Sequence, residues 1–238
     1  MGTLAALVLA TPLFGFQLEL DPAIMTPSTS VPMVGSAVSF EPVPDDAEGG
    51  GGAAAPRRGP TTAELMQQRG ELAQIHKWMG VATWVSMTAT VVLGYLQYYN
   101  LYGMFASLED TPCVRGNAVF GQGACSRQPL PHLVSSLMTT ALYSVTFGLS
   151  LRMPDPMNLS EGDSDYAKNL RRHKRLRWVH FAGMLAQMLL GVVIANADTF
   201  GLSRANDYRA LQALSTVHFA IGLTTYAAMT WAGVIFLF

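Results

Sequence analysis

The chain has 238 residues, of which half are apolar and only 13% are charged, and its formal net charge is −1. Soluble domains carry about 25% charged residues, so this shortage, with a mean hydropathy of +0.26, argues against an ordinary soluble domain and predicts a membrane protein. The sequence contains no phosphate-binding loop, dinucleotide fingerprint, zinc-protease motif or nucleophile elbow. Nothing in it supports a nucleic-acid role.

The N-terminal part of the chain is expected to carry no packed core. Residues 3–16 form an apolar run that is short for a membrane span, so residues 1–20 are interpreted as a signal peptide or a short apolar anchor. Residues 21–60 hold most of the prolines and the run Gly49 to Gly52, which predicts a disordered linker. Residues 61–71 are expected to start a helix, with Thr61 or Thr62 as its cap and Glu64 in its first turn.

Four apolar segments follow, at about 75–99, 133–151, 178–197 and 214–238. Each has about the 20 residues that cross a hydrocarbon core. None has a proline in its middle or a Lys, Arg, Asp or Glu in its central part. The pattern predicts an all-α, multi-pass integral membrane protein, with residues 61–238 forming an up-and-down four-helix bundle in the lipid bilayer.

The charges of the loops bear on the orientation in the membrane. Side A is the side on which the first and third segments begin, and side B is the other. The expected side A loop, residues 152–177, is rich in Lys and Arg, whereas the side B loops carry few. The positive-inside rule then places side A in the cytoplasm and suits a bacterial inner membrane. A cleaved signal peptide would place side A outside, so the orientation stays open.

Cys113 and Cys125 lie twelve positions apart in the first side B loop. The spacing does not match a zinc site, and we expect one local disulfide, with a reactive pair as the alternative. A disulfide would agree with side B facing an oxidising compartment.

Histidine is rare, yet four of the five histidines open the four apolar segments: His76, His132, His180 and His218. Ionisable residues inside a membrane are functional by default. His76 and His180 share one depth, and His132 and His218 share another, because alternate segments begin on the same side. Helices that run parallel are diagonal partners in such a bundle, so a porphyrin fits between them with one imidazole on each face. The pattern predicts two haems b with these four metal ligands.

Small residues near the histidines are expected to let a flat ring approach the backbone. Gly80 and Gly222 lie four positions after His76 and His218, and Gly183 lies three after His180. All three are candidate haem neighbours, although small residues are also common at helix contacts. Gly94 is eighteen residues beyond His76 and points towards the second site.

Paired histidines could instead bind copper or zinc, but such sites usually recruit Cys, Met or carboxylates. His173 lies in the basic run RRHKRLR and is expected at the surface. Trp78 and Trp178 are expected in the aromatic belt at the membrane interface.

One histidine at the start of each of four consecutive helices resembles the four-helix core of the cytochrome b561 and ferric-reductase transmembrane superfamily. The residues that carry the resemblance are 76–80 (HKWMG), His132, 172–181 (RHKRLRWVHF) and 217–222 (VHFAIG), and it covers about residues 70–238. It implies the same pairing of histidines, first with third and second with fourth. It also implies an oxidoreductase that moves electrons from a donor such as ascorbate or quinol on one face to an acceptor such as ferric iron on the other.

Two alternative functions remain open at this point. The chain could be a membrane-anchor cytochrome subunit of a larger redox complex, with partner subunits that supply the electrons. It could also be a structural bundle without haem, whose histidines form hydrogen bonds between helices.

Overall fold

The structure is a computed structural model that describes residues 59–126 and 129–236. Within these two ranges the chain forms helices, turns and loops but no strand, so the predicted all-α class is confirmed. The interpretations of residues 1–20 and of almost all of the linker at 21–60 lie outside the described residues.

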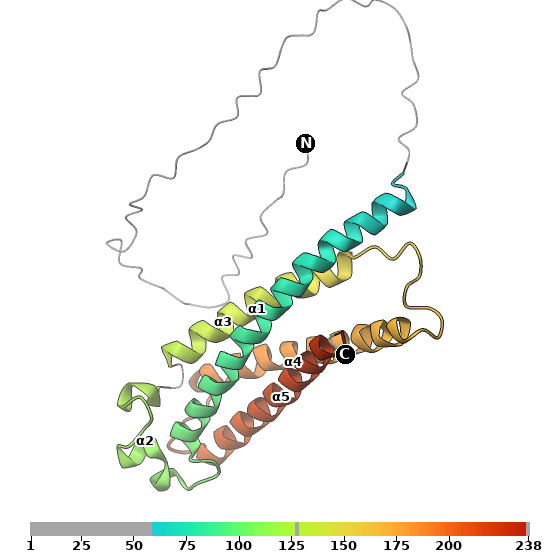
Figure 1. Ribbon diagram of the computed structural model, residues 1–238. Coiled ribbons are helices and arrows are strands. Elements are labelled where there is room, and N and C mark those ends of the chain that lie inside the picture. The colour runs from blue at the N-terminus through green and yellow to red at the C-terminus, as the bar shows by residue number, and fades with distance from the viewer. Residues whose placement is uncertain (1–58, 127–128, 237–238) are drawn as a thin grey trace, which may run out of the picture. The chain divides into compact units, whose positions relative to one another are not determined.

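Four long helices make up most of the described chain: α1 (Thr62–Tyr102), α3 (Leu130–Arg152), α4 (Asp165–Ala195) and α5 (Tyr208–Val234) (Figure 1). Short helices connect α1 to α3: η2 (Leu108–Asp110), α2 (Pro112–Arg115) and η3 (Gln122–Cys125). A further short helix, η4 (Ala197–Phe200), lies between α4 and α5. Each of the four apolar segments read from the sequence overlaps one long helix.

The first helix begins where its capping residues predict. Thr61 is the N-cap of α1, its hydroxyl accepts the Glu64 N–H at 3.3 Å, and the Glu64 carboxylate accepts the Thr61 N–H at 2.6 Å. This reciprocal capping box satisfies two N–H groups that a helix start leaves without partners. The helix ends at Gly103, whose φ of 52° is left-handed and is adopted readily by glycine.

The start of α4 corrects one expectation. Residues 152–177 were expected to form a loop, but the loop ends at Ser164, whose hydroxyl accepts the Ala167 N–H at 3.1 Å and caps α4. The basic run therefore lies on a helix. Lys and Arg are good helix formers, and a helix can begin well before the apolar part that would cross a membrane.

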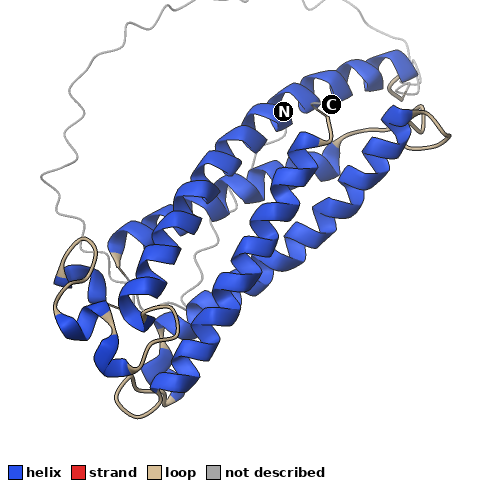
Figure 2. Ribbon diagram, turned by 60° about the horizontal axis from the view of Figure 1, so that its bottom comes forward, coloured by secondary structure: helices blue, strands red, loops and turns tan. Residues whose placement is uncertain are grey.

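The long helices lie side by side (Figure 2). Neighbouring helices run antiparallel, since residue numbers fall along one helix as they rise along the other. The contacts that show this are Thr83 with Thr146 and Ser86 with Thr139 between α1 and α3, Trp84 with Thr230 and Tyr98 with Thr216 between α1 and α5, Asn169 with Ile235 and Gln187 with His218 between α4 and α5, and Ser150 with Arg177 and Tyr143 with His180 between α3 and α4. It follows that α1 runs parallel to α4, and α3 runs parallel to α5.

Hydroxyl groups join α1 to α3. The Thr83 and Thr146 hydroxyls are 2.9 Å apart, and the Thr139 hydroxyl lies 2.8 Å from that of Ser86 and 2.9 Å from that of Thr90. Thr83 and Thr139 are buried. Small hydroxyl residues let membrane helices approach closely and supply hydrogen bonds between them.

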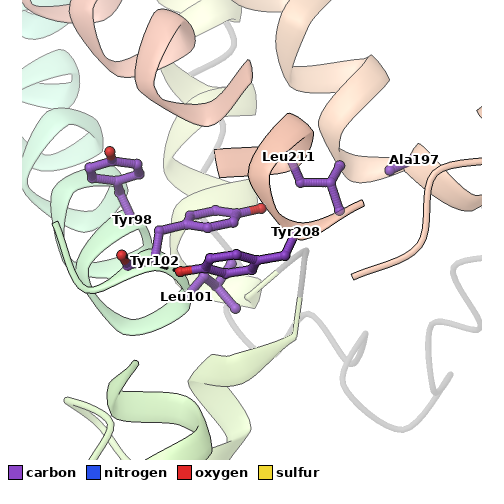
Figure 3. Close-up of a cluster of buried hydrophobic side chains, with 6 residues drawn as sticks. All are labelled: Tyr98, Leu101, Tyr102, Ala197, Tyr208 and Leu211. Atoms are coloured by element: carbon purple, nitrogen blue, oxygen red, sulfur yellow. Dashed lines mark hydrogen bonds between the residues drawn. The ribbon is translucent and has the colours of Figure 1, made fainter. Parts of the chain in front are cut away.

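An aromatic cluster joins the C-terminal end of α1 to the N-terminal end of α5 (Figure 3). Tyr98 and Tyr102 come from α1, and the Tyr208 ring lies 5.7 Å from that of Tyr102. Cys113 packs against the same cluster and forms a disulfide with Cys125, as the sequence predicts. The disulfide therefore holds the connection between α1 and α3 beside this end of the helices.

The described helices expose much apolar surface. Within the described residues, α1, α3 and α4 are long and apolar enough to cross a membrane by length and composition, and α5 is not among them. Four spans were expected, and α5 is not among the three that meet these criteria. Large side chains such as Leu189 and Leu137 are 69% and 61% exposed. Such apolar faces would be costly in water, which is compatible with a membrane protein.

Candidate functional site

The five histidines fall into two groups at different levels along the helices. The first histidine site comprises His76 on α1 with His173 and His180 on α4. The second histidine site comprises His132 on α3 and His218 on α5. The ring centres of His76 and His173 are 6.0 Å apart, His180 lies near both of them, and His218 lies near His132.

In the first histidine site, His76 is held from the neighbouring helix α3. Its Nδ1 lies 3.1 Å from the carbonyl oxygen of Thr146. Its ring centre is 6.0 Å from that of His173, and the two ring planes are nearly perpendicular, at 85°. A backbone carbonyl on Nδ1 fixes the tautomer of a histidine and directs its other nitrogen, Nε2, elsewhere.

His173 is not the surface residue that the basic run suggests. It is half-buried, its Nδ1 lies 2.9 Å from the Ala232 carbonyl oxygen on α5, and its ring packs 5.2 Å from that of Phe236. The expectation was wrong because α4 begins before the basic run, so that His173 lies on the side of this helix that faces α1 and α5. The flanking Arg172 and Arg175 are exposed.

His180, the expected partner of His76, contacts α3. The ring is buried and its Nδ1 lies 2.8 Å from the Tyr143 hydroxyl, with the two ring centres 5.6 Å apart. Tyr143 also belongs to a small apolar cluster with Met87 and Met184. The structure thus brings two α4 histidines to the first site where the sequence indicated one.

The second histidine site lies at a closely packed place between helices. A Cβ added at Gly94 would be 2.9 Å from Cε1 of His132, and one added at Gly191 would be 3.5 Å from Cε1 of His218. Gly94 therefore lies against the second site, as its spacing from His76 indicated. Gly191 was missed from sequence, although it lies eighteen residues after His173 on α4 and the same spacing could have found it.

Both histidines of the second site have a buried ring nitrogen without a partner. Nδ1 of His132 and Nδ1 of His218 form no hydrogen bond with the described residues, although the Thr90 carbonyl lies near the His132 ring. A buried polar atom without a partner destabilises a fold by about 1–3 kcal/mol.

The three glycines expected beside a haem contact other side chains. A Cβ at Gly183 would collide with the Thr225 hydroxyl, and one at Gly222 would lie 3.3 Å from the side-chain oxygen of Gln187. Gly80 faces Thr146 more loosely, at 4.0 Å. Gly183 and Gly222 therefore allow close packing of α4 on α5, and their role beside a haem stays a prediction.

The basic run of α4 is partly occupied by contacts within the protein. Lys174 binds Asp155 at 3.1 Å, and Arg171 donates to the carbonyls of Ser160 and Gly162, both at 2.8 Å. Burial raises the pKa of the Asp155 carboxyl, but the Leu159 N–H and the Lys174 ammonium outweigh it and hold that pKa below its usual 3.8. These bonds fasten the loop between α3 and α4 to the first turns of α4.

Trp78 and Trp178 lie close to the first site in the chain and are 61% and 51% exposed. Lys77 and Arg177 lie over their rings, at 5.8 and 5.3 Å from the ring centres. Exposed tryptophans beside cationic side chains are typical of a membrane interface.

Two surface grooves were found away from the histidines. One, of about 210 Å³, is lined by α4 and α5 and includes Gly183 and Thr225. The other lies along α1 around Trp84 and Val85. Neither groove is lined by a histidine, so neither defines a site.

The donor set of each histidine site suits one kind of metal group. Among the described residues, no cluster of three or more His, Cys, Asp or Glu side chains could hold a bare metal ion. A haem iron needs only axial ligands from the protein, because the porphyrin supplies the others, and two histidines are sufficient. Two imidazoles per site are therefore enough for a haem iron, and haem binding at these sites stays a prediction.

Comparisons with known proteins found no matching family model, no matching curated protein and no matching solved structure.

Proposed function

We propose that the chain is an integral membrane redox protein in which the four long helices form an up-and-down bundle around two haems b. More specifically, it is a cytochrome that passes electrons from a donor on one membrane face to an acceptor on the other. A bacterial inner membrane is the proposed location. Ascorbate or a quinol is a candidate donor, and ferric iron is a candidate acceptor.

The placement of histidines on all four long helices, at two levels, is the observation that carries this proposal. His76 and Gly94 mark the two levels on α1, and eighteen helical residues span about 27 Å. A hydrocarbon core is about 30 Å thick. The two sites would therefore lie near opposite faces of the membrane, where each is close to one aqueous compartment.

The chain's own residues would hold, orient and insulate the haems. His132 and His218 supply imidazoles to the second site, and the Thr146 carbonyl orients His76 in the first. A bound haem would supply one-electron chemistry, and these histidines would hold its iron. Apolar helices around the sites would exclude water and lower the local dielectric constant, which tunes the reduction potential.

Spectroscopy of the haem-replete, detergent-purified chain tests the proposal. We expect reduced b-type absorption bands and two haems per chain. His132→Ala and His218→Ala should each remove one haem and leave the other, because the two histidines serve the same site. Absence of b-type bands from the haem-replete protein would reject the cytochrome and leave a structural bundle.

An assay in proteoliposomes tests whether the protein carries electrons across the membrane. Proteoliposomes with ferricyanide trapped inside and ascorbate outside should reduce the trapped ferricyanide, and His218→Ala should slow that reduction at least tenfold. If a spectrally intact protein cannot reduce trapped acceptor but co-purifies with a soluble redox subunit, the anchor-subunit function replaces this one.

A further inference from the structure

We propose that His173, and not His180, is the partner of His76 as a ligand of the haem in the first histidine site. This inference rests on the proposed function and concerns the ligands of one of its two sites. Spacing alone favours His180, since His180 stands at the edge of the apolar segment as the other three histidines do. The contacts in the structure favour His173.

The separation of the rings is the first argument. Metal–nitrogen bonds to histidine are about 2 Å long, so imidazoles on opposite sides of one metal have ring centres about 6 Å apart. The ring centres of His76 and His173 are 6.0 Å apart. These two side chains therefore already have the spacing that a shared iron requires.

The hydrogen bonds of both rings are the second argument. His76 uses Nδ1 for the Thr146 carbonyl at 3.1 Å, and His173 uses Nδ1 for the Ala232 carbonyl at 2.9 Å. Those carbonyls belong to α3 and α5, so each ring is fixed by a different helix. Histidines that bind a metal through Nε2 commonly donate Nδ1–H to a carbonyl in this way. Both rings are thus prepared for ligation through the same nitrogen.

His180 has a different set of contacts. Its Nδ1 is engaged by the Tyr143 hydroxyl at 2.8 Å, and its ring packs edge-on against the Tyr143 ring. His180 lies seven positions after His173, which places it about 10 Å further along α4. We assign His180 as a positioning residue that joins α3 to α4 beside the haem, rather than as a ligand.

Matched single variants of the full-length chain distinguish the two histidines. Haem per chain would be measured for His76→Ala, His173→Ala and His180→Ala, with helix content checked by circular dichroism. We expect His173→Ala to match His76→Ala, with loss of one low-spin haem or its conversion to a high-spin form. Added imidazole should restore the low-spin spectrum of His173→Ala by occupying the vacated position. His180→Ala should keep two low-spin haems, with at most a shifted potential.

The outcomes separate this inference from the proposed function. The inference is overturned if His173→Ala keeps two low-spin haems. It is also overturned if His180→Ala loses one low-spin haem and added imidazole restores it. In both cases His173 is not the ligand, and the proposed cytochrome function is unaffected. Loss of both haems from a folded His173→Ala variant would also overturn it. If the unaltered chain binds no haem, the proposed function itself fails.

Discussion

At the scale of single residues, the contacts of the histidines identify the members of each site better than their positions in the sequence do. Four histidines mark the starts of four apolar segments, and all four lie in the two histidine sites. The fifth, His173, was assigned to the surface because its neighbours in the sequence are Arg and Lys. Its ring packs on His76 and Phe236 instead. A charged neighbourhood in sequence does not decide which way one helical side chain points, since residues one apart lie about 100° apart around the axis.

Gly94 gives a test of the second histidine site. Gly94→Ala would place a methyl group 2.9 Å from Cε1 of His132, which is too close. We expect the ring to be displaced, with loss of one haem and destabilisation by about 1–3 kcal/mol from overpacking. Haem stoichiometry and thermal unfolding of the purified protein would measure both effects.

Gly148→Ala is the matched control for this substitution, because nothing lies within 4 Å of a Cβ added at that helical glycine. Alanine at an open helix position is favoured by about 0.5–1 kcal/mol. The control should therefore keep two haems and unfold at the same or a higher temperature. Equal behaviour of the two variants would show that His132 has more room than its contact with Gly94 implies.

At the scale of elements, much of the helical structure follows from the sequence, and the exceptions have physical causes. The α1 cap could be predicted because Thr61 and Glu64 form a local, reciprocal hydrogen-bonded box. The start of α4 was placed too late because hydropathy marks where a helix becomes apolar, not where it begins. The contact of Gly183 with Thr225 could not be predicted, since it depends on the register between two helices that share no sequence signal.

The loop between α3 and α4 offers a test at the scale of elements. Asp155 accepts the Leu159 N–H at 2.9 Å, binds Lys174 on α4, and lies 3.8 Å from Arg69 on α1. Asp155→Asn should weaken these contacts and lower stability at pH 7 by about 1 kcal/mol, as expected for a partly exposed charged hydrogen bond. For a chain of this size that is a fall of about 2–4 °C in Tm.

The pH dependence gives the same test a second readout. The pKa of Asp155 is held below its usual 3.8 in the folded chain, so its contribution is present above that value and is lost as the pH falls through the lowered pKa. Unaltered protein should therefore lose part of its Tm advantage over Asp155→Asn below about pH 4. Asp163→Asn, at an exposed position of the same loop, should leave Tm unchanged. A constant difference between the Asp155 variant and the unaltered protein across this pH range would contradict the assignment.

At the scale of the whole molecule, the two ends of the described helices have different chemistry. The α1–α5 end carries the Tyr98 and Tyr208 cluster and the disulfide of Cys113 and Cys125. The α3–α4 loop at the other end is flanked by the basic first turns of α4. Disulfides persist in oxidising compartments, and Lys and Arg near helix ends are retained in the cytoplasm. Both features predict the same orientation, with the disulfide outside and the N-terminal end of α4 inside.

Thiol labelling on intact cells tests that orientation. In an Asp163→Cys variant the new thiol would stand in the exposed α3–α4 loop, while Cys113 and Cys125 are bonded to each other and do not react. We expect a membrane-impermeant maleimide to label residue 163 only after the membrane is opened. Unaltered protein treated with an impermeant reductant should instead be labelled at Cys113 and Cys125 on intact cells. The reverse pattern would contradict the predicted orientation and place the first histidine site near the external face.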